Sequence, residues 1–135
     1  MLTLLIYKDN KNTMYNFSNM NDNFEYKGFK EKGMKEGFGI QIWKDGAIYK
    51  GYFSKNKANG YGVFRHHDGD KYKGEFLVNR ASGYGIYLHS NGALYEGFWL
   101  DDCQNGIGEE CWNDDSNYFG EYHMGKKQGL GTELI

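Results

Sequence analysis

Hydrophobic and polar residues recur along this chain with a period of 23 residues. Five segments open with Tyr-x-Gly and carry a Gly-x-Gly nine residues after that glycine. The recurring tyrosines are Tyr26, Tyr49, Tyr72, Tyr95 and Tyr118. A period this regular indicates a repeat array, in which each unit packs mainly against its neighbours. It favours an extended binding surface over a single catalytic pocket.

Two turn signals divide each repeat into two short strands. Counted from the tyrosine as position 1, positions 20 and 21 hold pairs such as Asp45-Gly46, typical of a two-residue type I′ hairpin turn. Position 8 holds Gly, Asn or Asp, which tolerate positive φ and mark a second turn. The expected fold is all-β: an elongated single-layer twisted antiparallel sheet of about six tandem 23-residue hairpins, with no helix in the array.

The chain is expected to form a single domain over 1–135. Residues 3–25 carry a degenerate copy of the unit, and terminal repeats are commonly atypical because they cap the stack. The full repeats are expected at 26–48, 49–71, 72–94 and 95–117, followed by a truncated repeat at 118–135.

A two-residue turn would set the pairing between repeats. It pairs Ile42 with Tyr49 and Ile40 with Gly51, so the tyrosines share a face with aliphatic and aromatic side chains. A single-layer sheet leaves such a face partly wet, and we expect an aromatic groove that binds a protein segment such as a helix. The alternative is that the rings cover one another and bind nothing. The expected groove residues are Tyr26, Tyr49, Phe53, Tyr61, Tyr72, Phe76, Tyr84, Tyr95, Trp99, Tyr118 and Tyr122.

Position 18 forms a second row, expected on the face opposite the tyrosines: Trp43, His66, His89 and Trp112. This row is either cross-strand packing or a second contact strip. Equivalent residues lie two strands apart, roughly 9.5 Å, whereas zinc needs its nitrogen donors at about 2 Å, so no metal site is expected. Nucleotide-binding, metalloprotease and hydrolase motifs are absent, so we expect no enzyme, no catalytic residue and no cofactor.

Charge is unevenly distributed along the 135 residues. The net charge of −2 gives no strong attraction to nucleic acid. Residues 26–69 sum to +5, however, and residues 95–124 to −8. The pattern fits either ordinary solvation or a homodimer steered by opposite charges.

The remaining features concern location. Cys103 and Cys111 are expected to be free thiols in a reducing, cytoplasmic compartment, with a disulfide as the alternative. No signal peptide and no apolar stretch of about 18 residues is evident. Leu134-Ile135 would leave an apolar edge strand, so either the native chain continues or this edge pairs with another copy.

The motif Tyr-x-Gly-x-aromatic, as in Tyr49-Lys50-Gly51-Tyr52-Phe53, resembles the MORN (membrane occupation and recognition nexus) repeat over residues 26–131. Lys30, Glu109 and Asp115 depart from its pattern. The resemblance implies a scaffold in a cytoskeletal or membrane-apposed complex, a targeting domain of a larger enzyme, or a module that binds phospholipid. For anionic phospholipid, the expected contacts are Lys27, Lys30, Lys32 and Lys35.

Overall fold

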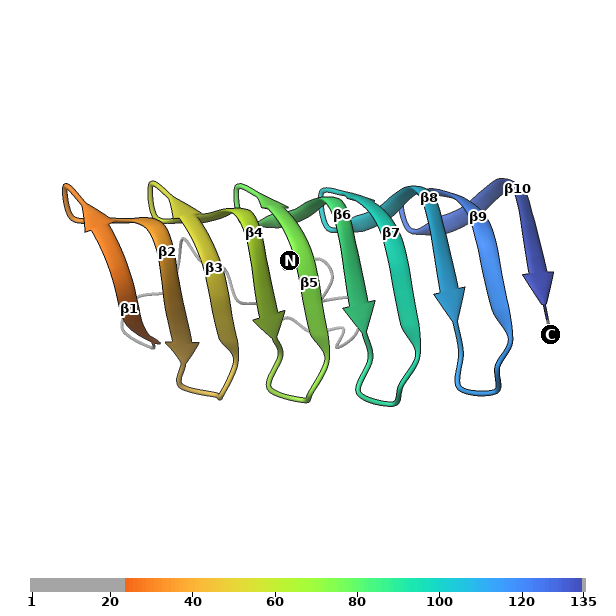
Figure 1. Cartoon of the computed structure of the whole chain (residues 1–135), viewed down its shortest axis with the longest axis horizontal. Helices are drawn as coiled ribbons and strands as arrows, with labels where there is room; N and C mark the ends of the chain where they lie inside the picture. The colour runs from red at the N-terminus through yellow and green to blue at the C-terminus, as the bar shows by residue number, and fades with distance from the viewer. Residues whose placement is uncertain (1–23, 135) are drawn as a thin grey trace.

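The computed structural model describes residues 24–134, which form one antiparallel sheet of ten strands joined in chain order. Figure 1 shows the strands side by side along the long axis of the array. These residues contain no helix, so the expected all-β hairpin array is confirmed. The predicted degenerate repeat at 3–25 lies outside the described residues, apart from Phe24 and Glu25. The strands are β1 (Phe24–Glu31), β2 (Met34–Trp43), β3 (Ile48–Ser54), β4 (Lys57–Arg65), β5 (Lys71–Leu77), β6 (Arg80–Leu88), β7 (Leu94–Leu100), β8 (Cys103–Cys111), β9 (Asn117–His123) and β10 (Lys126–Leu134).

The Asp-Gly turns are longer than expected. Between β2 and β3, Trp43 N–H donates to the Ala47 carbonyl at 2.9 Å, and Gly46 N–H donates to the Trp43 carbonyl at 3.0 Å. This is a three-residue loop, in which a type I turn is followed by a glycine with φ of 102°. Asp45 supports the loop, because its Oδ1 accepts from Ala47 N–H at 3.0 Å. Only the glycine needs positive φ here, so the predicted type I′ turn is wrong.

This one extra loop residue shifts the register. Ile42 pairs with Ile48, and Tyr49 pairs with Gln41. The predicted pairs of Ile42 with Tyr49 and of Ile40 with Gly51 are therefore wrong by one residue. Because side chains alternate between faces, a one-residue shift moves every side chain of one strand to the other side of the sheet relative to its neighbour.

The turns at position 8 use the type I′ geometry instead. Lys55 and Asn56 between β3 and β4 have φ of 49° and 72°, and Val78 and Asn79 have φ of 47° and 68°. The position-8 residue also joins adjacent repeats. Asn79 N–H donates to the Ala58 carbonyl at 2.9 Å, and Ala58 N–H donates to Asn79 Oδ1 at 2.8 Å. Asp102 makes the same pair of bonds to Ala81, at 2.9 and 2.7 Å.

The core lies on the face that bears the tyrosines, here called the inner face. Glycines at positions 3 and 14 pair across the strands, as Gly51 does with Gly62 and Gly74 with Gly85. Each tyrosine ring lies over such a pair: a Cβ on Gly62 would come within 3.0 Å of the Tyr49 ring. The absence of a side chain on both glycines is what lets the ring lie against the backbone.

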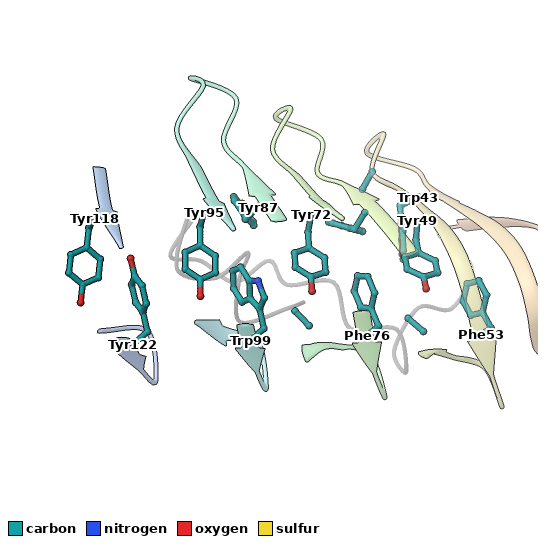
Figure 2. Packing of buried hydrophobic residues seen from close by; sticks show 14 residues of the cluster. Trp43, Tyr49, Phe53, Tyr72, Phe76, Tyr87, Tyr95, Trp99, Tyr118 and Tyr122 are labelled. Atoms are coloured by element: carbon teal, nitrogen blue, oxygen red, sulfur yellow. The ribbon is translucent and has the colours of Figure 1, made fainter. Parts of the chain in front are cut away.

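Tyrosine rings alternate with the aromatic rings of position 5 in one continuous row. Tyr49 meets Phe53 at 5.1 Å and Phe76 at 5.2 Å between ring centroids, both edge to face. Figure 2 shows the two sets of rings pointing toward one another from opposite parts of the curled sheet. Edge-to-face contact is the favourable geometry for aromatic pairs, so the sheet builds a core without a second layer.

Candidate functional site

The predicted aromatic groove is mostly a buried core. Tyr49, Tyr72 and Tyr95 are at most 1% exposed. The hydroxyl of Tyr49 donates to the Tyr52 carbonyl at 2.8 Å, and that of Tyr95 to the Phe98 carbonyl at 2.9 Å. The expectation of a partly wet tyrosine face is therefore wrong, because the sheet curls and its own rings cover one another. Partner binding by this set stays a prediction.

The register shift divides the predicted groove residues between two faces. Tyr26 and the other position-1 tyrosines lie on the inner face with Phe53, Phe76, Trp99 and Tyr122. Tyr61 and Tyr84 lie on the opposite, outer face, where Tyr61 pairs with Glu75 and Tyr84 with Phe98. Tyr61 is 52% exposed, so these two rings are available to solvent while the rest of the set is largely enclosed.

The position-18 row is on the inner face, not opposite the tyrosines as predicted. Trp43 packs edge to face on Phe64 at 5.8 Å, and both belong to the core cluster. Trp112 packs against the same cluster and is half-buried. The correction has the same cause, since one register step places positions 16, 18 and 1 on one side.

The two histidines of this row differ in environment. His66 is buried and its Nδ1 lies 2.9 Å from Asp68, whereas His89 is half-exposed and its Nδ1 lies 3.6 Å from Asp70. Asp70 also accepts from the Tyr87 hydroxyl at 2.5 Å and from Ser90 N–H at 2.8 Å. Across residues 24–134, no group of His, Cys, Asp and Glu is placed to hold a metal ion.

The four lysines predicted to contact anionic lipid are not equivalent. Lys27, Lys30 and Lys32 are exposed, but Lys35 is buried. Its Nζ donates to Gln41 at 2.7 Å and lies 4.6 Å from the Phe24 ring. Burial, and then the charge of Lys30, lower the pKa of Lys35 to about 8. Lys35 is therefore part of the core and is wrongly included as a surface contact.

The outer face carries an exposed apolar row that crosses the array, here called the ridge. Cross-strand pairs build it: Phe38 faces Tyr52 with rings 5.7 Å apart, and Tyr84 faces Phe98 with rings 5.6 Å apart. Its side chains are between 38% and 69% exposed. The ridge consists of Phe29, Phe38, Tyr52, Tyr61, Tyr84, Phe98 and Ile107. The exposed Glu75 on β5 interrupts it between Tyr61 and Tyr84.

Glycines at position 12 make room for the ridge. Gly60 and Gly106 have φ of 105° and 103°, where the strand register is interrupted. A Cβ on Gly60 would lie 3.4 Å from the Cβ of Tyr52, and one on Gly106 would lie 3.3 Å from the Cβ of Phe98. Sequence reasoning missed Phe29, Phe38, Tyr52, Phe98 and Ile107, although the alternation along each strand would have found them with the correct loop length.

Charged residues run beside the ridge in a single cross-strand row. Lys27, Lys50 and Lys73 lie in the first half of the array, separated by Ile40 and Val63. Beyond Ile86 the same row continues with Glu96 and then Glu109. All five charged side chains are exposed. Glu96 also accepts a hydrogen bond from the Tyr84 hydroxyl, which raises the pKa of that phenol.

Two further observations concern the cysteines and membrane-spanning helices of the described residues. Cys103 and Cys111 are free thiols, as predicted. In residues 24–134, no helix has the length and apolar character needed to cross a membrane.

Comparison with known families identifies the repeat. A family model described as the MORN repeat matches residues 26–48, 49–71, 72–94, 95–116 and 118–134. A comparison with curated proteins gave no match.

Proposed function

The chain belongs to the MORN-repeat family, and from this premise we propose that it is a non-catalytic interaction scaffold that binds a protein partner on its outer face. MORN repeats are generally associated with protein or membrane interaction and are not known as catalysts. The ridge carries the proposal, because exposed aromatic side chains gather on both sides of Glu75 and an exposed apolar patch commonly marks an interaction site. A cytoplasmic location, beside the cytoskeleton or a membrane, belongs to the same proposal.

The burial of the tyrosines favours the ridge over the inner face as the contact surface. Tyr49, Tyr72 and Tyr95 have almost no accessible area to exchange for contact with a partner. Tyr52, Tyr61 and Phe98 would bury large rings on association, and aromatic side chains dominate the binding energy of most interfaces. Their outward direction leaves the core packing unchanged when a partner binds.

Affinity capture from native cells tests this proposal with two matched triple variants. The first changes ridge residues, Tyr52→Ser, Tyr61→Ser and Phe98→Ser. The second changes exposed apolar residues in or beside the tight turns, Leu77→Ser, Val78→Ser and Met124→Ser. We expect the ridge variant to lose its protein partners at least tenfold and the turn variant to keep them, with circular dichroism confirming that both are folded. Equal capture by both variants would reject the proposal.

Anionic phospholipid is a second candidate, favoured by the exposed row of Lys27, Lys50 and Lys73 beside the ridge. Each lysine close to an anionic membrane surface contributes about 1 kcal/mol. Glu96 and Glu109 in the same row oppose this attraction. Sedimentation with phosphatidylserine and phosphoinositide vesicles at physiological salt decides, because absence of the protein from the vesicle pellet excludes this candidate. The role of a targeting module within a larger enzyme stays a prediction.

A further inference from the structure

We infer that the occupant of the outer face is a second copy of this chain, packed antiparallel with ridge against ridge. The inference rests on the proposed function, because both assign the contact to the ridge. It adds the identity of the partner and the direction in which that partner lies.

The charges on the outer face are complementary to those of a second, reversed copy of the chain. The row beside the ridge is basic at Lys27, Lys50 and Lys73 and acidic at Glu96 and Glu109. The two halves of one outer face therefore carry opposite charge. A surface of this kind is complementary to itself when one copy is reversed, and complementary charge steers association and fixes orientation.

Symmetry then selects one arrangement. Two identical sheets packed face to face are related by a two-fold axis lying between them. An axis along the array would bring the basic half of one copy, with Lys50 and Lys73, to the basic half of the other, where like charges repel. An axis parallel to the strands reverses the array instead. It keeps ridge against ridge and turns the basic half of one copy toward the acidic half of the other, with Lys50 on β3 opposite Glu109 on β8 where the ends of the two arrays coincide.

The available area is of the size that a dimer needs. Ten strands spaced about 4.8 Å apart give a length of about 43 Å. Three rows of outward side chains, two residues apart along each strand, give a width of about 15 Å. The product, about 650 Å² per copy or about 1,300 Å² for the pair, is an upper limit because the sheet curls, and it falls at the lower end of the roughly 1,200–2,000 Å² of a standard interface. The third row adds Ile42, Ile48, Leu88 and Leu94, with Arg65 and Lys71 between the two pairs.

Sedimentation equilibrium with charge-swapped variants tests the antiparallel dimer. One variant makes the whole row acidic, with Lys27→Glu, Lys50→Glu and Lys73→Glu. The other makes it basic, with Glu96→Lys and Glu109→Lys. We expect wild-type protein to have twice the 15.6 kDa mass of the chain, each variant alone to have the monomer mass, and an equimolar mixture to recover the dimer mass. Raising the salt concentration should weaken the mixed dimer, because exposed charges are screened.

A control variant carries the same change in net charge away from the row, with Lys44→Glu, Lys55→Glu and Lys126→Glu, and should remain dimeric. The ridge variant described above should be monomeric. Wild-type protein that is monomeric at about 100 µM, well above the micromolar Kd range, would overturn the inference. So would a mixture that fails to associate, or a ridge variant that stays dimeric.

The failure of this inference is distinguishable from that of the proposed function. A monomeric wild type whose ridge variant still loses a captured protein would show a different protein on the ridge. Binding of the monomer to anionic vesicles, lost in the acidic-row variant, would show lipid there. Either outcome would overturn the inference that a second copy occupies the ridge. Only capture of a different protein would leave the proposed function as a protein-binding scaffold intact.

Discussion

Each buried tyrosine depends on glycines in two adjacent strands. The Tyr72 ring lies over Gly74 and Gly85, and its hydroxyl donates to the Glu75 carbonyl at 3.0 Å. A Cβ on Gly85 would come within 3.0 Å of Tyr72 Oη and Cζ, which belong to a rigid, buried ring. Glycine is therefore required here for close approach. Gly33 is instead favoured by its positive φ of 79°, a conformation that Asn56 and Asn79 adopt at the same position of other repeats.

We expect Gly85→Ala to destabilise the array strongly, because the added methyl group displaces a core ring. Overpacking a tight core costs typically about 1–3 kcal/mol, with additional loss where the next ring must also move. Gly33→Ala is the control, because nothing lies within 4 Å of its Cβ position and only backbone strain of about 1–2 kcal/mol is expected. Urea denaturation measures both. A smaller loss for Gly85→Ala than for Gly33→Ala would contradict this account of the glycine row.

Adjacent hairpins are joined by hydrogen bonds of the turn residues as well as by the backbone hydrogen bonds between strands. The reciprocal bonds of Asn79 to Ala58 and of Asp102 to Ala81 link the turn of one repeat to the strand of the previous one. A side-chain oxygen is required for one of the two bonds, and Ala58 and Ala81 are fully buried. This explains why position 8 carries Asn or Asp where glycine alone would satisfy the backbone conformation.

Asn79→Gly should retain the turn and lose the side-chain bond, leaving the Ala58 N–H unsatisfied at a cost of about 1–3 kcal/mol. Asn79→Asp should remain close to wild type at neutral pH, since Asp102 makes the same bond one repeat later at 2.7 Å. Thermal unfolding of the two variants compares them directly. The interpretation fails if Asn79→Asp is as unstable as Asn79→Gly.

At the scale of the whole array, the edge-to-face row of rings runs through the described strands without interruption, from Tyr26 to the pair of Tyr122 and Tyr118. Lysines mark both ends of this row. Lys35 lies 4.6 Å from the Phe24 ring, and Lys127 lies 4.7 Å from the Tyr118 ring, at a position that holds buried Ala58 and Ala81 in inner repeats. The array is thus one elongated core, and the ionisation of its tyrosines affects the stability of the whole.

Alkaline pH should unfold the array. Burial raises the pKa of Tyr49, Tyr72 and Tyr95 above the ordinary value of 10.0. Above about pH 10 the unfolded chain loses protons that the folded one keeps, so the free energy of unfolding falls by about 1.4 kcal/mol per pH unit for each tyrosine. Lys35 acts oppositely between pH 8 and 10.5, because its folded pKa is lowered and stability rises there.

The midpoint of urea denaturation, measured between about pH 8 and pH 11, reports the loss of stability caused by tyrosine ionisation. Tyr72→Phe removes one of the buried phenols whose pKa is raised, so the stability of this variant should fall less steeply above about pH 10 than that of wild type. Equal slopes for the two proteins would show that Tyr72 does not contribute to the alkaline transition.

The sequence predicted most of the fold because the repeat is local. Tyr-x-Gly, Gly-x-Gly and Asp-Gly recur at the same spacing, and each is a property of a few neighbouring residues, so the array of tandem hairpins was correctly expected. The length of the Asp-Gly loop was wrongly predicted, because Asp45-Gly46 fits both a two-residue turn and a three-residue loop with a single positive φ. Choosing between them decides the face on which Tyr61, Tyr84 and Trp43 lie.

By itself, then, the sequence determined the period, the strands and the residues that must be glycine. Only the tertiary structure decided which surface is free. The sheet curls until its inner rings cover one another, and this depends on contacts between residues 23 or more positions apart, such as Tyr49 with Phe76. The same curling leaves Tyr52, Tyr61 and Phe98 on the outer face, where about half of each side chain stays exposed to water.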